Sequence, residues 1–113
     1  MITSWKNLES LDDLHQIVED SKQKPIVLFK HSTRCGTSLH AKHRLESEWD
    51  FEEGELDFYY LDLLKHRDVS NEIADQFNVV HQSPQIIILK NEQVVYHISH
   101  NAISVDRIKE VIK

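Results

Sequence analysis

The chain has 113 residues, of which 40% are hydrophobic and 28% are charged, a composition typical of a globular domain. Its net charge of −6 argues against a nucleic-acid-binding protein and against a polybasic protein of membrane surfaces. The longest apolar runs are far shorter than a membrane helix requires, and the first residues lack the apolar core of a secretory signal. We therefore expect a monomeric, cytoplasmic protein of one domain, residues 1–113.

The first half of the chain predicts a short strand, a helix, a buried strand and a second helix. Residues 5–8 favour the short strand, and apolar residues at helical spacing predict an amphipathic helix over 11–21. The unalternating apolar run 26–29 is typical of a strand that is covered on both faces, and residues 31–34 are expected to form a loop. From residue 36 a helical pattern continues to the vicinity of Gly54. The acidic residues Glu52, Glu53 and Glu55 around that glycine are then expected to form a solvated helix end.

The second half of the chain predicts a strand, a helix, a hairpin and a closing helix. Alternation over 56–61 indicates a strand, and a helix follows over 69–77 with Ser70 as a possible cap. Strands over 85–90 and 93–99 are joined by a two-residue turn, so they should pair antiparallel. Ser104 is expected to cap the last helix. The order β-α-β-α-β-α-β-β-α predicts an α/β fold in which helices flank a mixed central sheet.

Cys35 is the one cysteine of the chain, so any disulfide that it forms must include a thiol from another molecule. It is predicted to lie between a buried strand and the start of a helix, where free N–H groups and the helix dipole lower the pKa of a thiol. The basic residues Lys30, His31 and Arg34 favour the thiolate as well. The alternative is a cysteine packed as a small hydrophobe, but the polar segment 33–38 favours a reactive thiol.

Ser83-Pro84 directly precedes the strand expected at residue 85. Proline is tolerated at the first residue of a strand, which is one interpretation. The other is a cis peptide bond whose exposed backbone pairs with an extended substrate beside the thiolate. The order of the elements favours the second interpretation.

Three segments carry a resemblance to a known family: FKHSTRCGTS at 29–38, QSPQ at 82–85 and HISHN at 97–101. On this element order the chain resembles a thioredoxin-fold protein, with Cys35-Gly36-Thr37-Ser38 in place of the active-site motif and Ser83-Pro84 in place of the cis-proline. More narrowly, it is similar over residues 2–113 to the YtxJ-like monothiol bacilliredoxin family of low-GC Gram-positive bacteria.

Two departures from thioredoxin bear on the mechanism. Ser38 stands where the resolving cysteine of a Cys-x-x-Cys motif would lie, and a hydroxyl cannot attack a mixed disulfide. Phe29 stands where thioredoxins bury an acidic residue. Both departures are consistent with a catalytic cycle that uses one thiol of this chain. Within the bacilliredoxin family a proline often follows the cysteine, whereas this chain has Gly36.

The resemblance implies a thiol–disulfide oxidoreductase whose Cys35 takes bacillithiol from S-bacillithiolated client proteins. Bacillithiol is then a co-substrate, no cofactor is tightly bound, and the partners are the clients and bacillithiol itself. The residues expected to bind substrate around Cys35 are Arg34, Gly36, Thr37, Ser38, Ser83, Pro84 and His100.

Two other functions stay open at this point. Cys35-Gly36-Thr37-Ser38 also resembles the Cys-Gly-Phe-Ser site of monothiol glutaredoxins, which share an iron–sulfur cluster between two chains. A thioredoxin-like binding module without catalysis is the other, and it predicts an unreactive Cys35. The pairs His40/His43 and His97/His100 lack a further ligand at a recognisable spacing, so no metal site is expected. His31 and His100 are the histidines expected near Cys35.

Overall fold

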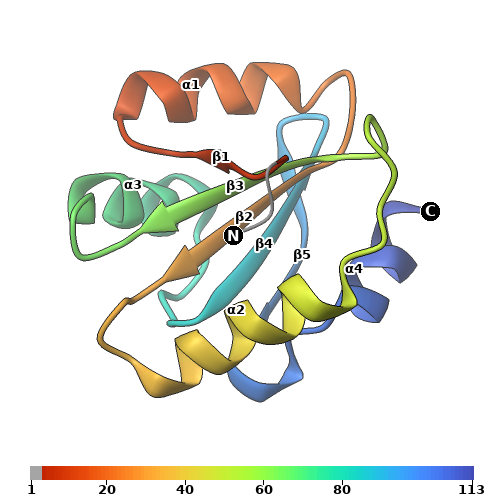
Figure 1. Ribbon diagram of the computed structural model, residues 1–113. Coiled ribbons are helices and arrows are strands. Elements are labelled where there is room, and N and C mark those ends of the chain that lie inside the picture. The colour runs from red at the N-terminus through yellow and green to blue at the C-terminus, as the bar shows by residue number, and fades with distance from the viewer. Residues whose placement is uncertain (1–3) are drawn as a thin grey trace.

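The computed structural model describes residues 4–113, which form a five-stranded mixed sheet with helices on both faces (Figure 1). The strand order is β1-β3-β2-β4-β5. The strands are β1 (Lys6–Asn7), β2 (Ile26–His31), β3 (Asp57–Asp62), β4 (Gln85–Lys90) and β5 (Gln93–Ser99). The helices are α1 (Leu11–Asp20), α2 (Gly36–Glu48), α3 (Arg67–Phe77) and α4 (Val105–Ile112), and a short 3-10 turn, η1 (His100–Ala102), follows β5.

Strand β2 lies at the centre of the sheet, parallel to β3 and antiparallel to β4. Every residue of β2 is buried, as is every residue of β4 except the last, because helices cover both faces of these strands. Their unalternating apolar sequences are what such a position requires. The hairpin of β4 and β5 is antiparallel, and positive φ angles at Asn91 and Glu92 close its turn. The predicted mixed sheet is confirmed.

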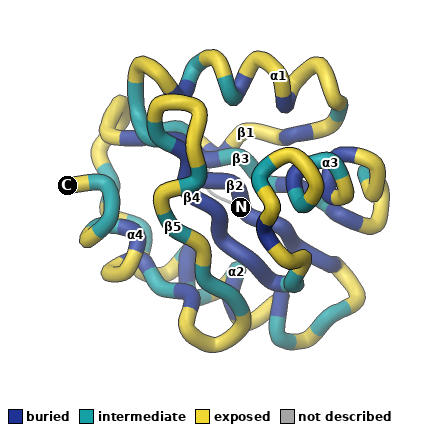
Figure 2. The backbone as a smooth tube through the Cα atoms, turned by 180° about the vertical axis from the view of Figure 1, so that it is seen from behind, coloured by how far each residue is buried: buried dark blue, intermediate teal, exposed yellow. Residues whose placement is uncertain are grey.

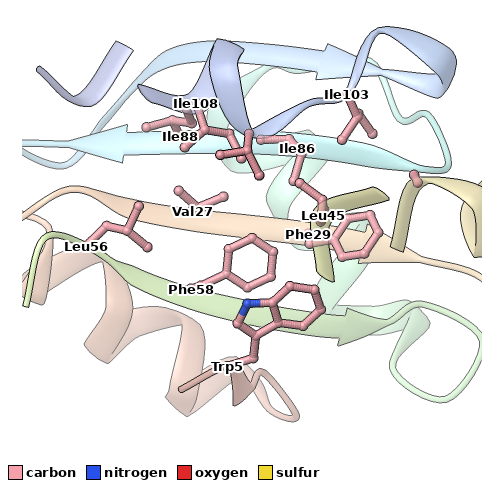
Figure 3. Close-up of a cluster of buried hydrophobic side chains, with 12 residues drawn as sticks. Trp5, Val27, Phe29, Leu45, Leu56, Phe58, Ile86, Ile88, Ile103 and Ile108 are labelled. Carbon is pink, nitrogen blue, oxygen red and sulfur yellow. The ribbon is translucent and has the colours of Figure 1, made fainter. Parts of the chain in front are cut away.

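Two hydrophobic clusters, one on each face of the sheet, bind the helices to it. Helices α2 and α4 cover the first cluster, and α1 and α3 cover the second. In the first cluster the rings of Trp5, Phe29 and Phe58 lie beside one another (Figure 3), and Trp5 is stacked on Phe58 with 4.4 Å between the ring centroids. Figure 2 shows the same arrangement as a buried central sheet inside helices whose outer sides are exposed. The cluster fixes α2, and therefore its first residue, relative to β2.

Several element ends differ from the prediction. Strand β2 continues through Lys30 to His31, the first residue of the expected loop, because both residues pair with β3 and are buried despite their polarity. Helix α2 ends at Glu48 rather than near Gly54. The next residue, Trp49, turns to an extended backbone, and its ring packs on Trp5 and Phe58. Glu52, Glu53 and Glu55 therefore lie in the segment that connects α2 to β3 and not at a helix end.

Two further elements begin elsewhere than predicted. Helix α3 begins at Arg67, so Ser70 lies inside its first turn and is buried, and His66 occupies the N-cap position. Strand β1 is limited to Lys6–Asn7, whereas a strand was expected over 5–8. The caps predicted for α1 and α4 are confirmed, with Ser10 and Ser104 each accepting a hydrogen bond from a backbone N–H of the first turn. Within residues 4–113 no helix is both long and apolar enough to cross a membrane.

Candidate active site at the start of helix α2

Cys35 is the residue that precedes α2, as predicted, and it occupies the N-cap position with an extended backbone. Strand β2 delivers the chain to this point, and a turn follows in which the Cys35 N–H donates to the Ser32 carbonyl at 3.2 Å. The Cys35 carbonyl then accepts the first hydrogen bond of the helix from the Leu39 N–H. The thiol is free and half-buried. It thus lies where the unpaired N–H groups of the first turn are concentrated.

The first turn of α2 favours the thiolate form of Cys35. The backbone N–H of Ser38 and then its hydroxyl lower the pKa of Cys35 below the usual value, and the same groups of Thr37 add to the effect. Partial burial acts in the opposite direction but is the weaker influence. A larger fraction of Cys35 is therefore thiolate near neutral pH than in an unfolded chain, and the thiolate is the nucleophile of disulfide exchange.

Ser38 connects the helix to the loop that precedes β4. Its side chain is fully buried, and its hydroxyl oxygen accepts a hydrogen bond from the Ser32 N–H at 3.3 Å. The same oxygen lies 3.3 Å from the Ser83 hydroxyl. Two residues from the separate predicted segments, Ser38 and Ser83, are thus in direct contact. The contact places the Ser83-Pro84 dipeptide beside the start of α2.

The Ser83-Pro84 peptide bond is cis, as the second interpretation of this dipeptide required. The pairing of its backbone with a substrate stays a prediction. Pro84 is buried, and its carbonyl accepts a hydrogen bond from the backbone N–H of His100 at 3.0 Å. His100 has a positive φ of 58° and an exposed side chain. The backbone of His100 therefore supports the proline, whereas its imidazole points to solvent. A role for that imidazole in substrate binding stays a prediction.

A cavity of about 350 Å³ opens beside the residues that precede Cys35. It is lined by Thr33, Arg34, Asp62, Leu64 and Lys65. Arg34 is exposed, and its guanidinium has no ion pair or hydrogen bond within residues 4–113. One carboxylate oxygen of Asp62 accepts hydrogen bonds from the backbone N–H groups of Leu64 and Lys65, which disperses part of its charge. Two cationic side chains and one carboxylate therefore border the cavity.

Gly36 is the first residue of α2 and follows Cys35 directly. A Cβ atom at this position would meet nothing within 4 Å, so packing does not require a glycine here.

His31 was expected near Cys35, and the structure buries its ring on the side of β2 that α2 covers, where the Ser38 backbone is one of the groups that act on its pKa. It packs against Phe29 and Tyr60 with centroids 5.5 and 5.2 Å away, and its Nδ1 is buried without a hydrogen-bond partner. Burial, and next the charge of Lys42, lower the pKa of His31 and favour the neutral ring. His31 thus contributes packing under the site rather than charge. Residues 4–113 also contain no group of three or more potential metal ligands.

Lys30 was expected only to favour the thiolate, and Gln85 only to begin a strand; the contacts of their side chains with the loop before β4 were not predicted. Both are essentially inaccessible, at 0% and 1% exposed. Both contact the residues just before Pro84. A lysine at the end of an apolar strand sequence was the available signal, because a buried lysine has to be accommodated by specific partners.

Comparison with known proteins identifies the family. The family model described as monothiol bacilliredoxin BrxC matches residues 6–108. A solved structure described as an oxidoreductase with a thioredoxin fold superposes with a TM-score of 0.83 at 30% identity, covering 97% of this chain and 95% of that one.

Thioredoxins share the fold at lower identity. The thioredoxin of Malassezia sympodialis gives a TM-score of 0.75 at 19% identity, with 96% of this chain and 88% of that chain covered. The thioredoxin of Fasciola hepatica gives 0.70 at 20% identity, with 95% of each covered. The fold is therefore that of thioredoxin, and the chain belongs to the monothiol bacilliredoxin family.

Proposed function

We propose that this protein removes bacillithiol from S-bacillithiolated proteins by thiol–disulfide exchange at Cys35. The family and the fold support a thiol oxidoreductase. The observation that carries the proposal is the position of the one cysteine, half-buried before the first turn of α2, where Ser38 and Thr37 lower its pKa. An inert binding module would not need a thiol activated in this way.

The first step transfers bacillithiol to the enzyme. The Cys35 thiolate attacks the bacillithiol sulfur of the client's mixed disulfide, a new bond forms between these two sulfurs, and the client sulfur leaves as a thiolate that takes a proton from water. No oxidant or reductant is consumed, because one disulfide replaces another. Before attack, N–H groups of the α2 first turn hold the Cys35 thiolate in place.

The second step regenerates Cys35 with a thiol from solution. Ser38 occupies the position of a resolving residue and offers only a hydroxyl, so the chain has no internal thiol for this step. A thiolate of free bacillithiol attacks the bacillithiol sulfur on Cys35, and oxidised bacillithiol leaves as Cys35 returns to the thiolate. The cation pair Arg34 and Lys65 in the adjacent cavity favours a thiol that carries carboxylates, as bacillithiol does.

Client proteins are proposed to bind along the loop that ends in Ser83-Pro84. This loop contacts Ser38 directly and lies beside the start of α2, so an extended segment that pairs with its backbone would bring a disulfide to Cys35. The role of Pro84 follows from the resemblance to thioredoxin-fold enzymes.

The test is release of a client thiol in the presence of free bacillithiol. The wild-type protein should accelerate release from a bacillithiolated protein, and Cys35→Ser should be inactive. The same assay with a glutathionylated client and free glutathione tests which low-molecular-weight thiol the protein prefers. Equal rates for both would withdraw the bacillithiol preference and keep the exchange chemistry, whereas full activity of Cys35→Ser would end the proposal. Anaerobic reconstitution with iron and sulfide addresses the cluster-carrier alternative, which requires visible absorption that Cys35→Ser lacks.

A further inference from the structure

Lys30 is a fully buried lysine on the central strand of the sheet, and the exchange mechanism does not use it. It is 0% exposed and shares a face of β2 with Ile26 and Leu28, which belong to the cluster under α1 and α3. Its Nζ forms no ion pair with a carboxylate of residues 4–113. Burial lowers the pKa of Lys30 to about 8. Keeping a cation in such a place reduces the stability of the folded protein, so its contacts need an explanation.

The contacts of Lys30 lead to the segment 79–84, called here the proline loop, which connects α3 to β4. The Nζ atom donates to the Ser70 carbonyl at 3.1 Å and lies 3.3 Å from the His81 Nδ1. The Ser70 hydroxyl also lies 3.4 Å from that nitrogen. Burial, and next the charge of Lys30, lower the pKa of His81. A neutral ring can accept through Nδ1, so Lys30 ties β2 to α3 and to the proline loop at once.

A second buried polar residue holds the same loop from the neighbouring strand. Gln85 is the register partner of Lys30 in the antiparallel pair of β2 and β4. Its Nε2 donates to the Val80 carbonyl at 3.1 Å, and its Oε1 accepts from the Gln82 N–H at 3.4 Å. Figure 1 shows the end of β2 and the start of β4 side by side, at the edge of the sheet from which α2 begins.

Together the two side chains determine where the proline loop lies relative to Cys35. Lys30 and Gln85 contact the loop at His81, Val80 and Gln82, and the loop continues directly into Ser83. Ser83 in turn contacts Ser38 of the α2 first turn. A shift of about 1 Å in a binding segment is enough to reduce a reaction rate strongly, because the reacting atoms must meet in one geometry.

We propose that Lys30 is a positioning residue for client binding, which holds the proline loop in register with Cys35 through Ser70 and His81. The inference rests on the proposed function in one respect, that an extended client segment lies along this loop. It concerns the polypeptide part of the substrate and not the low-molecular-weight thiol. A small disulfide that reaches Cys35 without contacting the loop should therefore react at the same rate whether or not Lys30 is present.

The test compares two disulfides that release the same coloured thiolate. One probe is an extended peptide whose single cysteine is joined to 5-thio-2-nitrobenzoate, and the other is 2-mercaptoethanol joined to the same group. In both, the Cys35 thiolate attacks the sulfur of the peptide or of 2-mercaptoethanol, a new disulfide forms, and 5-thio-2-nitrobenzoate leaves as a thiolate. Neither reaction needs bacillithiol. A wild-type protein that reacts no faster than Cys35→Ser with either probe would refute the proposed function itself.

Lys30→Met is the principal variant, because it keeps an unbranched side chain of similar length and removes the charge and the donors. We expect the rate constant for the peptide probe to fall about tenfold, and that for the small probe to change less than about twofold. Lys90→Met is the matched control. Lys90 lies at the far end of β4 and donates to the Val111 carbonyl at 2.8 Å, so its loss removes a similar anchor away from the loop. Lys90→Met should leave both rates unchanged.

His81→Phe provides a second variant that leaves Lys30 in place. It should slow the peptide probe by a smaller factor, and its combination with Lys30→Met should be no slower than Lys30→Met alone, because both changes remove the same contact. The midpoint of thermal unfolding of Lys30→Met should equal or exceed that of the wild type. An unchanged peptide rate in both single variants, or an equal loss with both probes, would overturn the assignment.

Discussion

Ser38→Cys is the substitution that tests the one-thiol cycle most sharply. It places a thiol three residues after Cys35 in the first turn of α2, where only a hydroxyl now lies. Residues at this spacing on a helix have Cβ atoms about 5–6 Å apart, and a disulfide requires about 3.5–4.5 Å, so a small adjustment lets the two sulfurs bond. We expect the variant to resolve its own mixed disulfide and to form an internal disulfide.

The size of the effect follows from concentration and ionisation. A neighbouring thiol acts at an effective concentration of roughly 1 M, above that of a flexible linker and below that of an ideally oriented group. Against an external thiol of about 1 mM this is a factor of about 1,000. Ser38 is fully buried and Phe29 supplies no carboxylate to deprotonate its replacement, so burial lowers the thiolate fraction by about tenfold. The mixed disulfide should therefore decay about 100-fold faster than in the wild type.

The assay is a single turnover in which the Cys35 adduct is quenched with acid and followed by mass spectrometry. In the wild type the lifetime of the adduct should shorten in proportion to the added thiol. In Ser38→Cys the lifetime should be short and independent of it. Ser38→Ala is the control, because it removes the hydroxyl without adding a nucleophile. A lifetime in Ser38→Cys that equals that of the wild type and still depends on external thiol would refute the reasoning.

Two further predictions concern charge. The double variant Arg34→Gln/Lys65→Gln should transfer bacillithiol from a bacillithiolated peptide about tenfold more slowly than the wild type at low salt, as measured by initial rates. Its rate with a neutral mixed disulfide of 2-mercaptoethanol should not change. A loss of the same size with both substrates would count against an anion site. Burial lowers the pKa of Lys30 to about 8 in the folded protein from its ordinary value of 10.5, so between these values the unfolded chain binds more protons and stability rises with pH. Urea unfolding at pH 7 and pH 9 gives the free energy of unfolding of the wild type and of Lys30→Met. The wild-type value minus the Lys30→Met value should increase by about 1 kcal/mol from pH 7 to pH 9. A difference that does not change with pH would contradict a buried ammonium.

Much of the fold could be predicted from local patterns. The apolar sequences of β2 and β4 indicated central strands, and Ser10 and Ser104 marked two helix starts through their capping bonds. The boundary errors have a common cause in tertiary contacts. The Trp49 ring is drawn into the core, which ends α2 before the helical pattern of the sequence does. Periodicity alone does not report such a contact.

The site was predictable where one residue defines its own surroundings. Cys35 precedes a helix, and Ser83-Pro84 has the position and the cis bond that the element order favoured. The contacts between segments were not predictable. Nothing in the sequence indicates that His31 points into the core while its neighbour Lys30 points to the other face and to the proline loop. Alternation along β2 assigns these two side chains to opposite faces only once the strand is known to extend through them.

The most direct measurement of the central claim is the intact mass of the reduced protein after mixing with a bacillithiolated peptide. The account predicts one added bacillithiol, absent in Cys35→Ser and removed by free bacillithiol, together with stoichiometric release of the peptide thiol. An adduct of the peptide itself would show attack at the other sulfur. No adduct at all, with Cys35 still reduced and accessible to alkylation, would contradict the claim that this thiol is the nucleophile.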